Sequence, residues 1–204
     1  GATFIARAIA AAAAHPLGVG DARYRYSDQP GLVDTVPFGS FYADTLNRVG
    51  RYAPTLLSNE DYELNTRIRL QGGKVYFDPA IRSVYFARPT LSGLAKQYFR
   101  YGYWKLRMLK RYPATLRWRQ ALPPVFTASL VILMIAALFL PLVRWLLLFE
   151  LGVYFLILAA GSIPVARKKR DRRFIIGVPL AIAVMHVAWG TGFLWSLIKS
   201  AVKS

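Results

Sequence analysis

The chain has 204 residues, of which 55% are hydrophobic, with a formal net charge of +17 and no cysteine. So apolar a chain is not intrinsically disordered, because disordered chains are charged but poor in apolar residues. The lack of cysteine excludes a disulfide framework and a Cys-ligated metal. Nucleic acid is a common partner of basic chains, but no helix-turn-helix, zinc-finger or RNA-binding signature supports it here. A membrane protein, with apolar residues in lipid and basic residues at anionic headgroups, would account for both the high hydrophobic content and the positive charge.

The first half of the chain is predicted to alternate helices with short strands. Residues 3–14 are alanine-rich, with Ile5 and Ile9 spaced for one helical face, and His15-Pro16 ends that helix. Hydrophobic periodicity, glycine stops and polar N-caps predict the elements that follow. These are a strand at 32–36, a turn at 37–40, a helix at 41–49, a helix capped by Ser58 or Asn59 and ending near Leu70, strands at 74–77 and 83–87, and a long helix capped by Thr90 or Ser92 and ending at Arg111.

This long helix carries basic residues among aromatic ones, a composition that suits a helix lying at a lipid headgroup layer. The alternative is a solvated basic face over a packed aromatic face in a soluble domain. We favour the interfacial interpretation because of the apolar runs that come next. The residues concerned are Lys96, Arg100, Lys105, Arg107, Lys110 and Arg111, with Tyr98, Phe99, Tyr101, Tyr103 and Trp104.

Three apolar runs follow, at about 125–143, 146–165 and 174–198. At about 1.5 Å per residue, runs of this length suit a hydrocarbon core of about 30 Å. One large buried core is the weaker alternative, because three such runs exceed what a soluble core of this size uses. The sequence therefore predicts three transmembrane helices, the first two joined as a hairpin by a tight corner at Arg144-Trp145.

The basic cluster at 167–173 sets the predicted orientation. By the positive-inside rule this cluster is cytoplasmic, and the domain two crossings earlier is then cytoplasmic too. We expect a multi-pass protein of the inner (plasma) membrane. Within the spans, His186 is interpreted as a packing residue or a helix–helix hydrogen-bonding residue, with Glu150 as one candidate partner.

Two short motifs point to chemistry. The first is NEDYEL at 59–64, which puts carboxylates in the first turn of a predicted helix. The second is QYFRY at 97–101, which puts an amide, a guanidinium and an aromatic ring on one helical face, since positions i, i+3 and i+4 are neighbours there. A carboxylate that accepts a proton and an arginine that holds a phosphate suit a group-transfer site.

With these motifs the sequence resembles membrane-bound family 2 glycosyltransferases of the succinoglycan and exopolysaccharide type. The resemblance is carried by NEDYELNTRIR at 59–69, Gly72-Gly73, QYFRYG at 97–102, VDTVPFG at 33–39 and HVAWGTGF at 186–193. It covers nearly the whole chain, but only the second part of such an enzyme. It implies an α/β fold plus membrane helices: the C-terminal, acceptor-side part of a GT-A catalytic domain at 1–90, interfacial amphipathic helices at 91–121 and a transmembrane domain at 122–204.

The resemblance also implies roles for individual residues. Asp61 matches the family's base, which deprotonates the acceptor hydroxyl in an inverting transfer, and Glu60 would orient Asp61 or the acceptor. The alternative for Asp61 is that it only stabilises the N-terminus of its own helix. Arg100 matches the diphosphate-holding arginine, and Tyr101 stands where the commonest form of the motif has Trp. Substrate contacts are implied for Gln97, Arg100, Tyr101, Phe38 and Gly39. For Glu63, a surface position and an ion pair with Arg67 are equally open.

The family's nucleotide-binding half and its Asp-x-Asp metal motif are not found in this sequence. The chain begins with Gly1, not Met, and we interpret it as a piece of a longer protein. A divalent metal, Mg²⁺ or Mn²⁺, is therefore expected for the full-length family with ligands outside this chain, and this chain alone is expected to be inactive. The expected partners are a nucleotide-sugar donor, a lipid-linked or polysaccharide acceptor, and membrane lipids.

Two competing hypotheses remain open at this point. The chain could be a non-catalytic membrane anchor or assembly module of a polysaccharide machine, which the missing nucleotide-binding half favours. It could also be a small transporter or basic scaffold, but that leaves the face of Gln97, Arg100 and Tyr101 unexplained.

Overall fold

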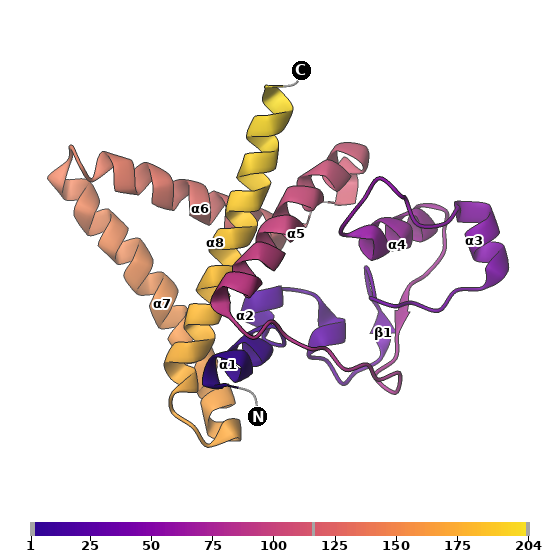
Figure 1. The fold of residues 1–204 in the computed structure, drawn as a ribbon, viewed down its shortest axis with the longest axis horizontal. Coiled ribbons are helices and arrows are strands. Elements are labelled where there is room, and N and C mark those ends of the chain that lie inside the picture. Colours follow the sequence, from indigo (N-terminus) through magenta and orange to yellow (C-terminus); the bar gives the residue numbers. More distant parts are fainter. Residues whose placement is uncertain (1–2, 116, 203–204) are drawn as a thin grey trace.

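The computed structural model describes residues 3–115 and 117–202, and within them the fold is mostly helical (Figure 1). Figure 1 shows α8 in the centre, with α6 and α7 on one side and α3, α4 and the small sheet on the other. The helices are α1 (Phe4–Ala12), α2 (Pro16–Val19), α3 (Ala43–Val49), α4 (Glu60–Leu70), α5 (Leu91–Arg111), α6 (Trp118–Ala136), α7 (Pro141–Lys169) and α8 (Phe174–Ala201), with 3₁₀ turns at Arg23–Arg25 and Pro113–Thr115.

Strand structure is sparse in this part of the chain. The described residues form one antiparallel sheet of two strands, β1 (Gly31–Leu32) and β2 (Tyr76–Phe77). The strands predicted at 32–36 and 74–77 are therefore present, but shorter. The strand predicted at 83–87 is wrong, because this segment has no regular secondary structure. Its Tyr85 side chain donates a hydrogen bond to Gln97 of α5. Two short strands do not confirm the α/β class of a GT-A domain.

Helix starts follow local capping chemistry. Thr3 Oγ1 accepts the N–H of Ala6 at 3.2 Å, and Thr90 Oγ1 accepts the N–H of Gly93 at 3.1 Å. Each bond satisfies a backbone donor that the first helical turn leaves free. Thr90 is thus confirmed as the cap of α5. The start of α4 differs, because the side chain of Asn59 makes no capping bond.

The main hydrophobic core surrounds the first half of α8. It joins Ile9 of α1, Leu94 of α5 and Leu158 of α7 to Ile182 and Met185 of α8, none of them more than 3% exposed. A smaller cluster joins α3 to α4. The main core therefore contains residues from each of the three predicted segments, and the division of the chain at 90 and 121 stays a prediction.

Glycines let α8 pack against its neighbours in backbone contact. A Cβ on Gly102 of α5 would overlap the carbonyl oxygen of Trp189, and one on Gly192 of α8 would overlap that of Phe99. Gly190 approaches α6 in the same way. Small residues are what allow helices to pack this closely. The motif at 186–193 is therefore the surface against which the helix of the QYFRY motif is fixed.

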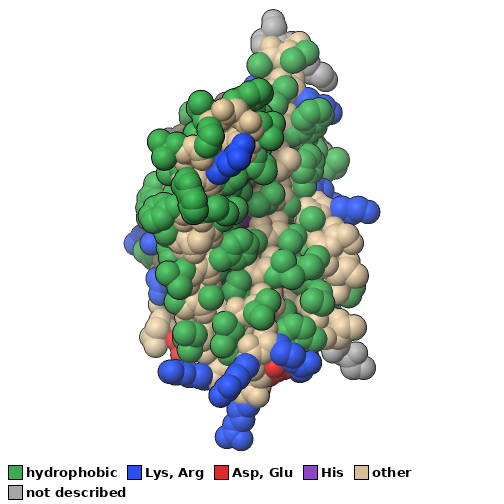
Figure 2. Space-filling model, turned by 90° about the vertical axis from the view of Figure 1, so that its left-hand side faces the viewer, with side chains coloured by type: hydrophobic (Ala, Val, Ile, Leu, Met, Phe, Trp, Pro, Cys, Tyr) green, Lys and Arg blue, Asp and Glu red, His purple; other side chains and the backbone are tan. Residues whose placement is uncertain are grey.

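Three helices, α6, α7 and α8, are long and apolar enough to cross a membrane. Figure 2 shows the face of the molecule that carries α6 and α7, where hydrophobic side chains gather and Lys and Arg collect at one end. Large exposed residues on these two helices include Ile132, Ile135, Leu142, Leu148, Phe149 and Leu156. A hydrophobic surface of this extent suits contact with lipid.

The corner of the hairpin lies earlier than the sequence suggests. It falls at residues 137–140, not at Arg144-Trp145, because Pro141 begins α7. Proline fits the first helical position, where its missing N–H has no partner to lose. Arg144 lies in the first turn of α7 and donates from Nε to the carbonyl oxygen of Ala137 at 2.9 Å. The arginine thereby satisfies a carbonyl at the end of α6.

Polar side chains join the membrane helices to each other and to the N-terminal region. Ser129 Oγ donates to Glu150 Oε1 at 2.6 Å, between α6 and α7. His186 lies 3.0 Å through Nδ1 from the Tyr154 hydroxyl and 2.9 Å through Nε2 from the carbonyl oxygen of Leu17. A helix–helix hydrogen bond by His186 is therefore confirmed, but the suggested pairing with Glu150 is wrong.

The basic loop between α7 and α8 lies beside the N-terminal helix. The Arg173 guanidinium lies 4.9 Å from the centre of the Phe4 ring of α1. An aromatic face attracts a cation in this arrangement. The cluster at 167–173 and helix α1 therefore lie at the same end of the membrane helices.

Candidate functional site

Asp61, in the first turn of α4, is the candidate general base. It is half-buried, and its Oδ1 accepts a hydrogen bond of 3.2 Å from the Tyr52 hydroxyl. Burial raises the pKa of the Asp61 carboxyl above its ordinary value, the charge of Glu60 raises it further, and the bond from Tyr52 lowers it in part. A carboxylate whose pKa is raised holds a proton more tightly, which suits a general base.

The acidic motif meets the QYFRY motif at Asn59. This residue has a left-handed backbone, with φ of 64°, which asparagine tolerates better than most residues. Asn59 stands at the N-cap position of α4, as predicted, but its side chain makes no capping hydrogen bond. Instead Asn59 Nδ2 donates to the backbone carbonyl oxygen of Tyr101 at 3.2 Å. The residue next to Glu60 and Asp61 is thus bonded to the residue next to Arg100.

On α5, the amide and the guanidinium of the QYFRY motif have different surroundings. Gln97 is 7% exposed, and its Nε2 donates to the Tyr101 hydroxyl at 2.7 Å while its Oε1 accepts from Arg88 Nε at 3.2 Å. Gln97 therefore orients Tyr101 in this structure. Arg100 is exposed and makes no hydrogen bond or ion pair with residues 3–115 or 117–202. Its guanidinium is available to an anion.

A third stretch of the resemblance, residues 33–39, is tied to the same helix. Asn65 of α4 donates from Nδ2 to Thr35 Oγ1 at 2.8 Å and to the carbonyl oxygen of Val36 at 3.1 Å. Phe38 follows with 84% of its surface exposed and a φ of 52°. A bulky side chain rarely takes that conformation, and such strain is found most often at functional sites.

Gly39 is closely packed beside Phe38, and a Cβ there would come within 2.8 Å of the Phe41 ring. A side chain at position 39 would therefore require the Phe41 ring to move. A role for Phe38 and Gly39 in an acceptor pocket stays a prediction.

The third acid of the motif, Glu63, is structural. It is fully buried and forms a two-point ion pair with Arg67, with both N–O distances 2.9 Å. The Tyr112 hydroxyl donates to the same carboxylate at 2.9 Å. Of the two alternatives for Glu63, the ion pair is correct, because a buried carboxylate needs a cationic partner.

No group of three His, Asp or Glu side chains within residues 3–115 and 117–202 is placed to hold a metal. Glu63 is committed to Arg67, which leaves only Glu60 and Asp61 in the motif. Mg²⁺ is usually bound by one or two carboxylates together with substrate phosphates and water. The metal and the location of its ligands stay a prediction.

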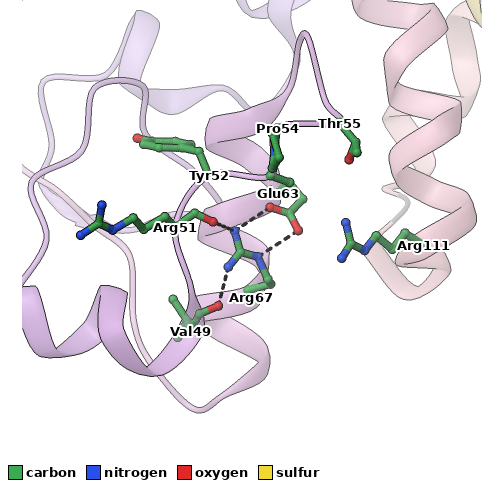
Figure 3. Close-up of a pocket in the computed structure, with 9 residues that line it drawn as sticks. Val49, Arg51, Tyr52, Pro54, Thr55, Glu63, Arg67 and Arg111 are labelled. Atoms are coloured by element: carbon green, nitrogen blue, oxygen red, sulfur yellow. Dashed lines mark hydrogen bonds and ion pairs between the residues drawn. The ribbon is translucent and has the colours of Figure 1, made fainter.

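A pocket of about 400 Å³ lies between the 49–55 segment, α4 and the end of α5 (Figure 3). Neither Asp61 nor Arg100 lines this pocket, but Tyr52 does, and its hydroxyl reaches Asp61. Sequence reasoning missed Tyr52, since it lies in an irregular segment where no periodicity marks it. The lining residues are Val49, Arg51, Tyr52, Ala53, Pro54, Thr55, Glu63, Arg67 and Arg111.

Lys105 is a second residue that sequence reasoning misplaced, as one basic residue of an interfacial helix. It is 4% exposed, its Nζ lies 3.6 Å from the centre of the Tyr62 ring, and this atom has no hydrogen-bond partner in the described part of the chain. Burial lowers the pKa of the ammonium to about 7, although the charge of Asp34 opposes that shift. Lys105 thus packs against α4 rather than facing headgroups.

The acidic and arginine motifs, joined by Asn59, and the three membrane-length helices are consistent with the resemblance to membrane-bound glycosyltransferases. The chain is 27% identical over 159 residues to the Succinoglycan biosynthesis protein ExoA of Rhizobium meliloti (strain 1021), which covers 76% of this chain and 45% of that protein. The resemblance to glycosyltransferases of exopolysaccharide biosynthesis is confirmed.

A more distant relative is a protein from Methanococcus voltae, 22% identical over 181 residues, or 88% of this chain and 52% of that protein. Its name is Dolichyl N-acetyl-alpha-D-glucosaminyl phosphate 3-beta-D-2,3-diacetamido-2,3-dideoxy-beta-D-glucuronosyltransferase. The chain spans about half the length of the curated relatives it matches. No family profile and no solved structure gives a significant match.

Proposed function

We propose that the protein is a membrane-bound, inverting glycosyltransferase of family 2 type, which transfers a sugar from a nucleotide-sugar to a lipid-linked or polysaccharide acceptor. The observation that carries this proposal is the bond from Asn59 to the Tyr101 carbonyl, which joins the motif of Asp61 to the motif of Arg100. An anchor or scaffold needs neither an acid with a raised pKa nor an unpaired guanidinium on the helix bonded to the same motif.

The proposed reaction is a single displacement. The Asp61 carboxylate takes the proton of the acceptor hydroxyl as that oxygen attacks the anomeric carbon. The bond from the anomeric carbon to the donor phosphate oxygen breaks, and its electron pair leaves with the nucleoside diphosphate. The Arg100 guanidinium offsets the charge that develops on the leaving phosphate. One displacement inverts the anomeric configuration.

A divalent metal, Mg²⁺ or Mn²⁺, belongs to the proposed full-length enzyme, with ligands outside this chain. Since this chain covers about half of its relatives, we expect that it does not transfer sugar alone. We further propose that the catalytic part faces the cytoplasm of an inner membrane, where nucleotide-sugars are available. The shared location of α1 and the basic loop at 167–173 supports that orientation.

Replacing Asp61 tests this function in the full-length protein. Asp61→Asn keeps the size of the side chain but removes the base, so we expect transfer to fall by about 10²–10⁴-fold while donor binding is unchanged. Asp44→Asn, on the exposed start of α3, is the matched control and should retain activity. Transfer at the normal rate by Asp61→Asn would refute the base assignment. A full-length, unmodified protein that transfers no sugar would leave a non-catalytic membrane module as the better hypothesis.

A further inference from the structure

The pocket of about 400 Å³ has no part in the reaction described above, although it adjoins the proposed base. Its volume falls in the range of about 300–1,000 Å³ in which proteins hold small ligands. Tyr52 lines the pocket, and its hydroxyl donates a hydrogen bond of 3.2 Å to Asp61 Oδ1. The pocket and the base are therefore separated by one side chain.

The pocket carries an excess of positive charge. Three arginines line it, Arg51, Arg67 and Arg111, against one acid, Glu63. Glu63 and Arg67 neutralise each other, and Arg67 also donates to the carbonyl oxygens of Gly50 and Arg51 at 3.0 and 2.6 Å. Arg67 thus has little capacity left for a ligand, and the remaining charge belongs to Arg51 and Arg111.

The two remaining arginines differ in direction. Figure 3 shows the guanidinium of Arg111 pointing from α5 toward Glu63, with the Thr55 oxygen on the same side, whereas the guanidinium of Arg51 points away. Within the described residues, the side chain of Arg111 makes no hydrogen bond or ion pair, and its guanidinium carbon lies 5.7 Å from the centre of the Tyr112 ring. An unpaired guanidinium that faces a pocket suits an oxyanion, which it binds through two parallel hydrogen bonds.

We propose that this pocket binds an oxyanion carried by the acceptor sugar, a phosphate or a carboxylate, with Arg111 as its anchor and Thr55 as a second donor. Binding there would hold a neighbouring acceptor hydroxyl beside Tyr52 and Asp61. The inference rests on the proposed function, and it narrows the acceptor to an acidic one. A lipid-linked sugar phosphate and an acidic sugar of a polysaccharide share this chemistry.

Ligand binding by the purified protein in detergent tests the inference without requiring turnover. Glucose 1-phosphate, glucuronate and glucose are titrated in turn and followed by calorimetry. We expect at least one of the two anionic sugars to bind about tenfold or more tightly than glucose, because a charge-assisted hydrogen bond is lost with the neutral sugar. Which anion binds better identifies the phosphate or the carboxylate as the preferred group.

Arg111→Gln should remove the preference for the anionic sugar, whereas Lys110→Gln should keep it. Lys110 is the matched control because it is exposed, lies on the same turn of α5 and does not line the pocket. Equal affinity for the anionic and neutral sugars would overturn the proposal, as would an equal effect of the two substitutions. Inorganic phosphate that binds as tightly as glucose 1-phosphate would also overturn it, since the sugar would then contribute nothing.

Two further results separate this inference from the proposed function. A nucleoside diphosphate that displaces glucose 1-phosphate would place the donor in the pocket and overturn the acceptor assignment. If Asp61→Asn abolishes transfer but Arg111→Gln leaves the acceptor KM unchanged, the enzyme assignment holds and the subsite is wrong. If the anionic sugar binds through Arg111 but the full-length protein transfers no sugar, the subsite stands and the enzyme assignment fails.

Discussion

At the scale of single residues, the candidate base is controlled by neighbours that a sequence pattern does not connect. Glu60 is adjacent in the chain, but Tyr52 reaches Asp61 from a separate irregular segment. The first raises the pKa of the Asp61 carboxyl and the second lowers it. The pH range in which Asp61 can accept a proton is therefore set by tertiary structure as much as by the motif.

Tyr52→Phe tests this control. The substitution removes a hydrogen bond that stabilises the charged carboxylate, so the pKa of Asp61 rises further above its ordinary value. Since the base works only when deprotonated, we expect the acid side of the pH–rate profile to move to higher pH. The profile of the full-length protein with its donor and acceptor is the measurement.

Tyr42→Phe is the matched control for that profile, because Tyr42 is 87% exposed and its hydroxyl makes no hydrogen bond in the described part of the chain. The profile of Tyr42→Phe should coincide with that of the unmodified protein. An unshifted acid side in Tyr52→Phe would show that the hydroxyl does not act on the base.

At the scale of elements, the site depends on how α5 lies against α8. Phe99 and Gly102 of α5 are in backbone contact with α8, while Arg100 between them is exposed. A shift of α5 along α8 would displace Gln97, Arg100 and Tyr101 together, because one rigid helix carries all three. The glycines of the crossing therefore affect both stability and the placement of the motif.

Gly102→Ala should be strongly destabilising. Its new Cβ would overlap the carbonyl oxygen of Trp189, which belongs to backbone and cannot rotate away. We expect the free energy of unfolding to fall by about 1–3 kcal/mol, the range for overpacking a tight contact. Thermal unfolding in detergent measures it.

Gly152→Ala in α7 is the control for this effect, since a Cβ there meets nothing within 4 Å. Gly152→Ala should leave the midpoint temperature of thermal unfolding unchanged or raise it slightly, because alanine favours a helix by about 1 kcal/mol over glycine. Equal losses in the two variants would mean that the crossing is looser than the structure has it.

At the scale of the whole molecule, three membrane-length helices and one basic loop define a topology. The hairpin of α6 and α7 turns at 137–140, and the chain returns to the basic cluster before α8. If the cluster is cytoplasmic, the turn lies on the opposite side of the membrane. The chain contains no cysteine, so introduced cysteines can report this directly.

Phe139→Cys and Arg172→Cys place one thiol at each end of α7. Both positions are exposed. With a membrane-impermeant maleimide, we expect Phe139→Cys to be labelled in right-side-out vesicles and Arg172→Cys only in inverted vesicles. The reverse pattern would place the Asp61 region outside the cytoplasm, where the proposed donor is not found.

Most residues of the candidate site could be predicted from the sequence, but the contacts between them could not. The acidic motif and the QYFRY motif are readable because each is local, and the Glu63–Arg67 pair follows from i, i+4 spacing. The bond from Asn59 to Tyr101 joins residues 42 positions apart, and no local pattern encodes it. The same is true of Tyr52 beside Asp61 and of Lys105 beneath Tyr62.

The sequence by itself determined the long helices, the three membrane-length runs and the two motifs, because helical periodicity and apolar length depend on neighbouring residues alone. Only the tertiary structure decided that the first half of α8 packs against α1 and α5 and that residues 83–87 form no strand. These depend on contacts between distant segments. Backbone contact at Gly102 and Gly192, and the burial of one lysine but not its neighbours, are set by shape rather than by composition.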